Sequence, residues 1–174
     1  MNKEELKELT EKTFEIFDCN NTKELKNNLY DVCINNKQEK IKDFAELIDY
    51  DFETDYLQKI YQYYEADRDN KGQDYTPKSL AKLVSKLSYD ENESECLDMC
   101  CGSGALTIQK WNNNHNLKFI LEEFDENVIP FLLFNMMLRN INCDVRHKDV
   151  LQNETFHLYK ITKQDEFGNL EVLK

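Results

Sequence analysis

Proline and glycine, the residues that most often mark turns, are scarce in this sequence. It has two prolines, Pro77 and Pro130, and four glycines in 174 residues. Because the prolines lie far apart, the chain contains no Pro-Pro dipeptide. Two of the glycines, Gly102 and Gly104, fall close together, which concentrates backbone freedom at a single turn.

Long apolar segments are also missing. No run approaches the ~18 apolar residues that a membrane-spanning helix needs, and residues 1–6 are charged rather than typical of a signal peptide. The six cysteines form no CxxC pair, and the adjacent Cys100 and Cys101 cannot easily face one tetrahedral metal site. We therefore expect a cytoplasmic chain with reduced thiols and no metal.

Positive charge is the third deficit. Lys and Arg number 22 against 34 Asp and Glu, so the formal net charge is −12. Binding to a nucleic-acid backbone depends on Lys and Arg displacing counterions, so this chain is not expected to bind nucleic acid unaided. A locally basic face remains compatible with the composition. The length suits one domain, or one domain with an appendage.

Apolar residues at helical spacing predict four short amphipathic helices in roughly the first 66 residues. Thr22 is expected to cap the second helix. A polar segment at 67–73 precedes Thr76, a predicted N-cap with Pro77 at the first helical position. We predict a helical N-terminal portion, 1–70, followed by an α/β portion, 71–174.

The second half of the chain changes to an alternation of strands and helices. Three short apolar runs indicate strands: 96–99, 117–121 and a segment within 143–150. Predicted helices separate them, one ending near Trp111 and one over 126–140. This order implies a parallel sheet with right-handed crossovers, hence the α/β class. Two alternating runs around Gly168, within 156–173, predict a C-terminal β-hairpin.

A glycine-rich turn, 101–104, directly follows the first predicted strand. Glycine lets a ligand approach the backbone, and the helix beyond the turn exposes free N–H groups. Glu123, ending the second strand, can accept hydrogen bonds from ribose hydroxyls, and Phe124 offers a face for a purine. Asp149, ending the third strand, can accept from an exocyclic amine. Since these ends meet at one crevice, they predict an adenosine pocket; without GxGxxG spacing, a dinucleotide fits less well.

The amino-acid sequences of four segments resemble the motifs of a known family. Residues 72–77 read Gly-Gln-Asp-Tyr-Thr-Pro, and residues 97–104 read Leu-Asp-Met-Cys-Cys-Gly-Ser-Gly. They resemble the Gly-Gln-aromatic-aromatic-Thr-Pro and Leu-Asp-Pro-x-Cys-Gly-Ser-Gly motifs of the N-6 adenine DNA methylases, notably the methylation subunits of type I restriction-modification systems. Residues 122–138 and 147–151 are similar to that family's second acidic motif and its Gly-Asp-x-Leu. The resemblance covers about residues 50–151 and implies a Rossmann-like methyltransferase core.

The resemblance also implies a site for S-adenosylmethionine (SAM). The residues that would form it are Tyr75, Thr76, Pro77, Asp98, Cys100, Gly102, Gly104, Glu123, Phe124 and Asp149. In this arrangement Asp98 would hold the methionine ammonium, and residues 75–77 would border the methionine end. Glu123 would bind the ribose, Phe124 would stack on the adenine, and Asp149 would face the adenine amine.

One departure from the family concerns the acceptor. The family's catalytic Asn/Asp/Ser-Pro-Pro-aromatic tetrapeptide orients a flipped adenine, and a chain without Pro-Pro cannot contain it. Met99 also replaces the family's Pro, and Asp74 replaces an aromatic residue. Methyl transfer needs an oriented acceptor as well as a bound donor, so the donor half is expected here and the acceptor half is not. No catalytic residue is assigned.

The sequence leaves three functions open. The first is a SAM-dependent DNA adenine methyltransferase, inactive alone and completed by a second subunit or using another small acceptor. The second is a non-catalytic, acidic interaction or inhibitor protein of a phage or other mobile element, although plain solvated helix faces are the favoured explanation of the acidity. The third is an enzyme that consumes SAM by cleavage. Each reading is compatible with a protein partner or a homo-oligomer.

Overall fold

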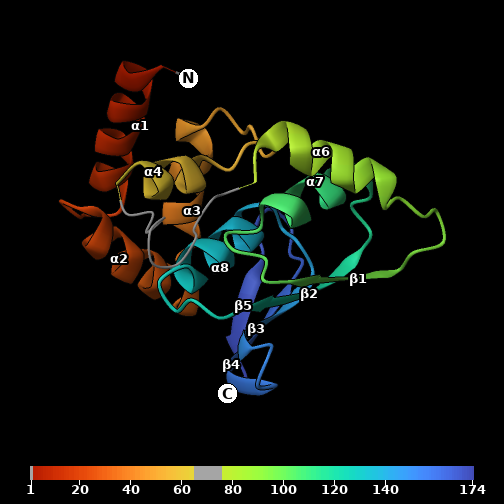
Figure 1. Ribbon diagram of the computed structural model, residues 1–174. Coiled ribbons are helices and arrows are strands. Elements are labelled where there is room, and N and C mark those ends of the chain that lie inside the picture. The colour runs from red at the N-terminus through yellow and green to blue at the C-terminus, as the bar shows by residue number, and fades with distance from the viewer. Residues whose placement is uncertain (1, 65–75) are drawn as a thin grey trace.

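The computed structural model describes residues 2–64 and 76–174 of the chain (Figure 1). The four helices predicted for the N-terminal portion are present. They are α1 (Lys3–Ile16), α2 (Thr22–Ile34), α3 (Gln38–Leu47) and α4 (Tyr56–Tyr64). A further amphipathic helix, α6 (Lys78–Leu87), precedes the first strand. The predicted boundary between the two portions, at residue 70, lies outside the described residues and stays a prediction.

Asparagine side chains fix the first turns of α1 and α2. The Asn2 side chain accepts from the Glu5 amide at 2.9 Å, and the Glu5 carboxylate accepts from the Asn2 amide at 2.8 Å, a reciprocal capping box. Asn21, and not the predicted Thr22, caps α2 by accepting from the Glu24 amide at 2.9 Å. Asn is as good a cap as Thr, and Thr22 is itself buried, so the prediction was wrong by one residue.

The predicted cap of α6 is also wrong. Pro77 has φ −58° and ψ 142°, so its backbone is extended and the helix begins only at Lys78. No side chain makes a capping hydrogen bond at this end. Thr76 therefore stands two residues before the helix, where its hydroxyl cannot act as an N-cap.

A five-stranded sheet forms the second half of the described chain. The strands are β1 (Glu95–Met99), β2 (Lys118–Glu123), β3 (Cys143–Asp149), β4 (Glu154–Thr162) and β5 (Asn169–Val172), in that spatial order. The first three are parallel, with α7 (Ala105–Asn113) and α8 (Ile129–Leu138) between them. The expected C-terminal hairpin is present as the antiparallel pair β4 and β5, and β4 also pairs antiparallel with β3. The chain is thus mixed α/β, as predicted.

The helices gather on one face of this sheet (Figure 1). All ten residues of α8 are buried, because the helix lies between the sheet and the N-terminal helices. Phe134 of α8 makes edge-on contacts with Phe17 and Phe44, at centroid distances of 5.3 and 5.4 Å. One apolar cluster therefore runs from the N-terminal helices into the sheet. Among the described residues, no helix has the length and apolar character to cross a membrane.

The other face of the sheet carries charged side chains in ion pairs. Lys118 lies 2.7 Å from Asp144. Arg146 and Lys148 each lie 3.0 Å from the same Glu122 oxygen. Burial alone would raise the pKa of Glu122, but the hydrogen bonds from Lys148 and Arg146 outweigh it and hold that pKa below its ordinary value. Charge pairing thus stabilises this face, which no helix of the described residues covers (Figure 1).

Candidate functional site

The glycine-rich loop, residues 100–104, turns sharply between β1 and α7. Cys100 and Gly102 both have φ of +58°, and Gly104 has φ of +96°, all in the left-handed region. A Cβ on Gly104 would lie 2.7 Å from Met136 Cε and 3.3 Å from Leu132 Cδ1, whereas one on Gly102 would meet nothing within 4 Å. Gly104 therefore permits the close approach of the loop to α8, and Gly102 leaves open space beside the loop.

Glu123 ties the glycine-rich loop to the carboxyl end of β2. Its Oε2 accepts from the Gly102 amide at 2.8 Å. Its Oε1 accepts from the amides of Phe124 and Asp125 at 2.9 and 2.8 Å. Because a carboxylate offers about four lone-pair positions, these bonds still leave Oε2 able to accept from a ligand hydroxyl. Glu123 thus orders the loop and presents an acceptor at the same time.

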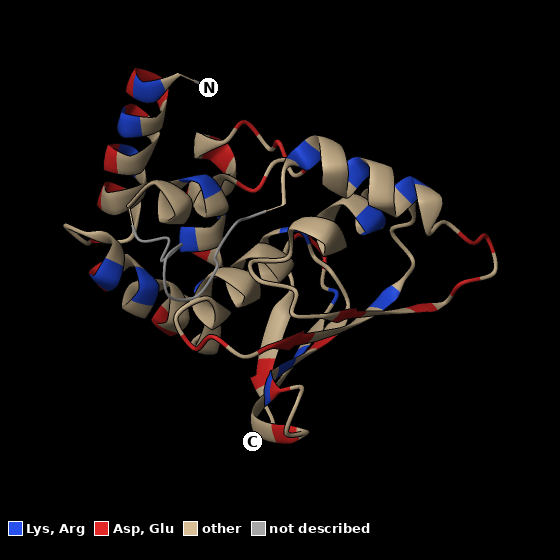
Figure 2. Cartoon of the chain, in the orientation of Figure 1, with Lys and Arg blue, Asp and Glu red and all other residues tan. Residues whose placement is uncertain are grey.

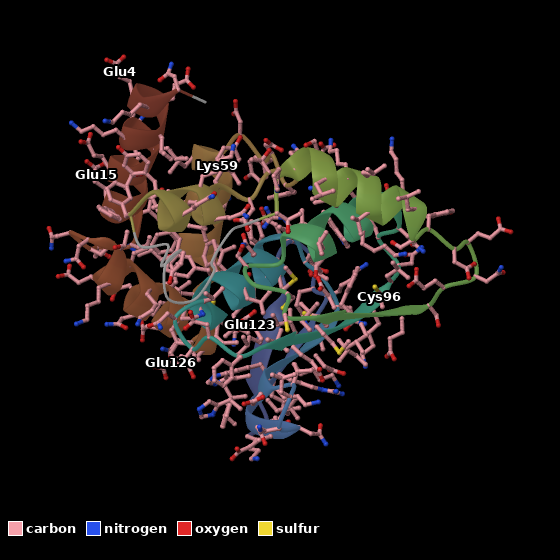
Figure 3. The ribbon with its side chains drawn as sticks, in the orientation of Figure 1. Glu4, Glu15, Lys59, Cys96, Glu123 and Glu126 are labelled. Atoms are coloured by element: carbon pink, nitrogen blue, oxygen red, sulfur yellow. The ribbon has the colours of Figure 1, made fainter. Side chains whose placement is uncertain are left out.

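A cleft of about 740 Å³ opens beside Glu123. Glu123 and Glu126, both labelled in Figure 3, belong to its wall. Asp125 and Asn127 add further polar lining. Aromatic side chains form another part of the wall: Phe124 is 59% exposed, and Phe156 lies 6.3 Å from it between ring centroids. The ring of His147 lies 4.9 Å from that of Phe156. The volume falls within the range of about 300–1,000 Å³ typical of small-molecule sites, and the flat walls suit a planar ligand.

Asp98 lies on β1, on the sheet face that α7 covers. Its Oδ2 accepts from the Thr107 hydroxyl of α7 at 2.6 Å. Burial raises the pKa of Asp98 above its ordinary value; the Thr107 hydrogen bonds oppose that rise, and the charge of Glu123 adds to it. A partly buried carboxylate of this kind would be favoured in its charged form by a neighbouring cation.

The remaining predicted residues lie in other places. Thr76 and Pro77 line a separate cavity of about 310 Å³ that also includes Lys59, labelled in Figure 3. Tyr75 lies outside the described residues. Asp149 ends β3, where its Oδ1 accepts from the amides of residues 151 and 152 at 2.9 Å each. It is not among the residues that line the 740 Å³ cleft. Ligand contacts for all these residues stay predictions.

Cys100 and Cys101 differ sharply although they are neighbours in the loop. Cys100 is exposed, whereas Cys101 is buried. Burial raises the pKa of the Cys101 thiol well above its ordinary value, and the charges of Asp98 and Glu123 add to that rise. Cys101 is therefore held as a neutral thiol beneath the loop. In the described part of the chain, no group of three or more His, Cys, Asp or Glu side chains is placed to hold a metal ion.

Sequence reasoning missed two walls of the cleft, His147 and Phe156. They meet because β3 and β4 are antiparallel neighbours, with His147 opposite His157 and a register shift just after it. The His147 Nε2 lies 3.0 Å from the Phe124 carbonyl, which links the two strands to the aromatic wall. The alternating pattern predicted the hairpin, but not its pairing with β3. Only that pairing brings Phe156 to the cleft.

A buried polar network holds the glycine-rich loop from behind. The Ser103 hydroxyl donates to Asp55 Oδ2 at 2.7 Å, and Asn135 Nδ2 donates to the Ser103 carbonyl at 3.0 Å. Arg139 donates to Asn135 Oδ1 at 2.9 Å and to the Thr54 carbonyl at 2.9 Å. Burial lowers the pKa of Arg139 to about 10, with Asp55 partly opposing that shift. The network joins the loop, α8 and the segment before α4.

Alanine substitution should separate the roles of the two loop glycines. Gly104→Ala combines a strained backbone with a contact that displaces Met136, so we expect a loss of about 2–4 kcal/mol in the free energy of unfolding. Gly102→Ala adds strain alone, about 1–2 kcal/mol. Urea denaturation of both variants provides the measurement. Equal losses would contradict the close packing assigned to Gly104, and the loss caused by Gly104→Ala should be smaller in a Met136→Ala background than in the wild type.

Comparison with known proteins agrees with this local chemistry. A model of the N-6 DNA methylases matches residues 48–168. The type I restriction enzyme MjaVII methylase subunit of Methanocaldococcus jannaschii is 32% identical over 107 residues, which cover 59% of this chain and 18% of that protein. The MjaVIII methylase subunit of the same organism is 27% identical over 103 residues, covering 58% of this chain and 18% of that protein. No solved structure matches the chain.

The matched region contains most of the features described above. It runs from the end of α3 through the glycine-rich loop and the 740 Å³ cleft to the connection between β4 and β5. The alignments with the two relatives span less than one fifth of each relative's length, so this chain corresponds to a part of those longer proteins. The motif resemblance is thereby confirmed, and the chain belongs to the N-6 DNA methylase family.

Proposed function

We propose that this chain binds SAM in the 740 Å³ cleft and supplies the methyl-donor site of a DNA adenine-N6 methyltransferase. The observation that carries the proposal is the hydrogen bond from the Gly102 amide to Glu123, a residue that also lines the cleft beside Phe124. Family membership supports a methyltransferase-like function, and N-6 methylases typically use SAM. The parallel order of β1, β2 and β3 supports the further proposal of a Rossmann-like core.

The residues present fit an adenosine group. The open space beside Gly102 admits a ligand against the loop backbone. Glu123 Oε2 is placed to accept from a ribose hydroxyl while it continues to hold the Gly102 amide. Phe124 and Phe156 offer flat faces for the adenine ring. No comparable cluster of aromatic side chains lines the 310 Å³ cavity among its described residues.

The methionine end would lie toward Asp98. Its carboxylate, partly buried and with a raised pKa, favours an ammonium group as its neighbour. The loop at 100–104 and the amino end of α7 lie directly beyond β1, so Asp98 and the loop border the same part of the site. Bound SAM supplies the transferable methyl group. The chain's own contribution is to bind the cofactor and fix the direction of its sulfonium.

The acceptor side must come from outside the described cleft. Pro77 adjoins α6 and Pro130 lies in α8, so neither belongs to a Pro-Pro loop at a strand end. After β3 the chain turns directly into β4 and β5. With a net charge of −12 the chain is also poorly suited to hold DNA alone. We therefore propose that methyl transfer to adenine requires an acceptor-binding region outside residues 1–174, such as one supplied by a second polypeptide.

Titration calorimetry with SAM tests the donor site. We expect micromolar binding, with Phe124→Ala weakening the affinity about 5- to 150-fold, since base–aromatic stacking contributes roughly 1–3 kcal/mol. Tyr50→Ala removes an exposed aromatic ring that is not part of the cleft and should leave the affinity unchanged. No heat of binding at millimolar SAM would overturn the proposal. Methylation of DNA by residues 1–174 alone would contradict the need for a separate acceptor-binding region.

A further inference from the structure

Helix α6 turns its large apolar side chains away from the protein. Its small residues, Ala81 and Ser85, are buried, and the Ser85 hydroxyl accepts from Asn113 of α7 at 3.1 Å. The exposed residues form one stripe: Leu80, Leu83, Val84 and Leu87, the last 79% exposed. Four aliphatic side chains on one side of a ten-residue helix normally face a core. We call this surface the α6 stripe.

Strand β1 is the outermost strand of the sheet, and no strand of the described residues pairs with its outer backbone edge. The Ser94 carbonyl accepts from the Lys118 amide at 3.1 Å, and alternation along the strand directs the backbone groups of Cys96 and Asp98 to β2. The backbone groups of Glu95, Leu97 and Met99 then point outward. The side chains of Leu97 and Met99 are 52% and 55% exposed. An open edge with apolar side chains favours pairing with another strand.

We propose that the α6 stripe and the β1 edge form the interface between two copies of this chain. A two-fold interface requires antiparallel pairing of the two β1 strands. With the axis at Leu97, each Leu97 would exchange N–H···O bonds with its counterpart, and Glu95 of one copy would pair with Met99 of the other. The outward direction of these three backbone positions suits that register. Apolar side chains then meet at the axis, and no two carboxylates stand opposite each other.

The charges around α6 favour a second copy as the occupant. Lys78 and Lys82 lie in the first half of α6 and share a single carboxylate, that of Glu53, at 3.4 and 3.0 Å. Asp90 and Glu91 lie in the loop beyond its carboxyl end. Figure 2 shows this separation of basic helix and acidic loop. The axis that pairs β1 also sets the two α6 helices antiparallel, so the lysines of one copy approach the acidic loop of the other.

Both α6 helices would lie on the same side of the extended sheet. Each helix belongs to the layer that covers one sheet face (Figure 1), and a two-fold axis perpendicular to the sheet keeps that face common to both copies. The two α6 stripes can then cover each other above the paired strands. The result would be one continuous sheet with a helix layer on one face, and it would bury both surfaces that a single copy leaves exposed.

Light scattering coupled to gel filtration tests this interface. Protein concentrations from about 1 to about 200 µM cover a dimer dissociation constant on the order of micromolar. Leu97→Lys and Leu97→Glu each place like charges at the axis, and Leu87→Glu puts a carboxylate in the α6 stripe. We expect each to raise the dimer dissociation constant at least about tenfold. Leu151→Glu, at an apolar residue that is 94% exposed elsewhere, is the matched control and should remain dimeric. Circular dichroism verifies that each variant is folded.

Mixing the two Leu97 variants gives the sharpest result. If the axis passes through Leu97, the Leu97→Lys and Leu97→Glu chains should be monomeric alone and dimeric when mixed, because opposite charges then meet. A monomeric wild-type chain over the whole concentration range would overturn the proposal and leave the surface to a different polypeptide. A wild-type dimer whose mass is unchanged by the Leu87 and Leu97 variants would overturn it equally.

Discussion

Asp98→Asn should weaken SAM binding about 10- to 150-fold and yet stabilise the ligand-free protein. The loss of affinity follows from replacing a charge-assisted hydrogen bond, which contributes roughly 1.5–3 kcal/mol, by a neutral one. The asparagine still offers an oxygen to the Thr107 hydroxyl that now donates at 2.6 Å. Titration calorimetry measures the first effect, and urea denaturation at neutral pH measures the second.

The sign of the stability change follows from the raised pKa of Asp98. A carboxyl group with a raised pKa binds its proton more tightly in the folded state than in the unfolded state. Its contribution to stability is therefore complete below about pH 3.9, the ordinary value for Asp, and is lost as the pH rises through the folded-state pKa. As the pH rises from about 3.9 through the folded-state pKa of Asp98, the wild type should lose stability relative to Asp98→Asn.

Asp165→Asn is the matched control, because Asp165 is exposed and far from the 740 Å³ cleft. It should leave the SAM affinity unchanged. Unchanged SAM affinity in Asp98→Asn would contradict the ammonium contact. A stability loss at neutral pH would contradict the burial of a charged carboxylate at this position. The SAM affinity therefore tests the ammonium contact, and the stability at neutral pH separately tests the burial of the Asp98 carboxylate.

Local features of the site were predictable from the sequence. Gly102 lies in the turn after β1 and Glu123 is the last residue of β2, and parallel strands bring their carboxyl ends together. Their contact at 2.8 Å is therefore a consequence of short-range patterns and of strand order. The helices were predictable for the same reason, since apolar residues with a period of 3.6 can be recognised within a segment of about a dozen residues. Cap positions depend on single backbone angles, and there the sequence prediction was wrong at Thr22 and Thr76.

Features that depend on pairing between distant segments could not be predicted in this way. Phe156 reaches the cleft only because β4 pairs with β3, and the alternation of β4 alone is compatible with several partners. Asp55 and Arg139 are charged residues, which a sequence pattern assigns to the surface. Both are buried because each meets polar groups from another part of the chain. The periodicity of a sequence does not indicate hydrogen bonds between residues that are far apart in the chain.

Arg139→Lys should destabilise the protein by about 2–4 kcal/mol, the largest loss that we expect from a substitution that keeps the charge. The guanidinium donates to three carbonyl groups and one side-chain oxygen: Phe52 O, Thr54 O, Asn135 O and Asn135 Oδ1, at 2.7–3.1 Å. A lysine cannot reproduce this planar fork. Buried acceptors left without a donor each cost roughly 1–3 kcal/mol, partly offset by relaxation around the smaller head group.

Arg146→Lys supplies the matched comparison on the open face of the sheet. Arg146 bonds a single Glu122 oxygen that Lys148 also reaches, and its side chain is partly exposed. The same Arg-to-Lys change should therefore shift the free energy of unfolding by no more than about 0.5 kcal/mol. Urea denaturation of both variants makes the comparison, and similar losses at the two positions would contradict the role given to Arg139.

Because Arg139 holds Asn135, and Asn135 holds the Ser103 carbonyl, Arg139→Lys should also loosen the glycine-rich loop. Buried Cys101 should then react faster with a thiol reagent in Arg139→Lys than in Arg146→Lys, which ties the distant guanidinium to the loop without any cofactor present.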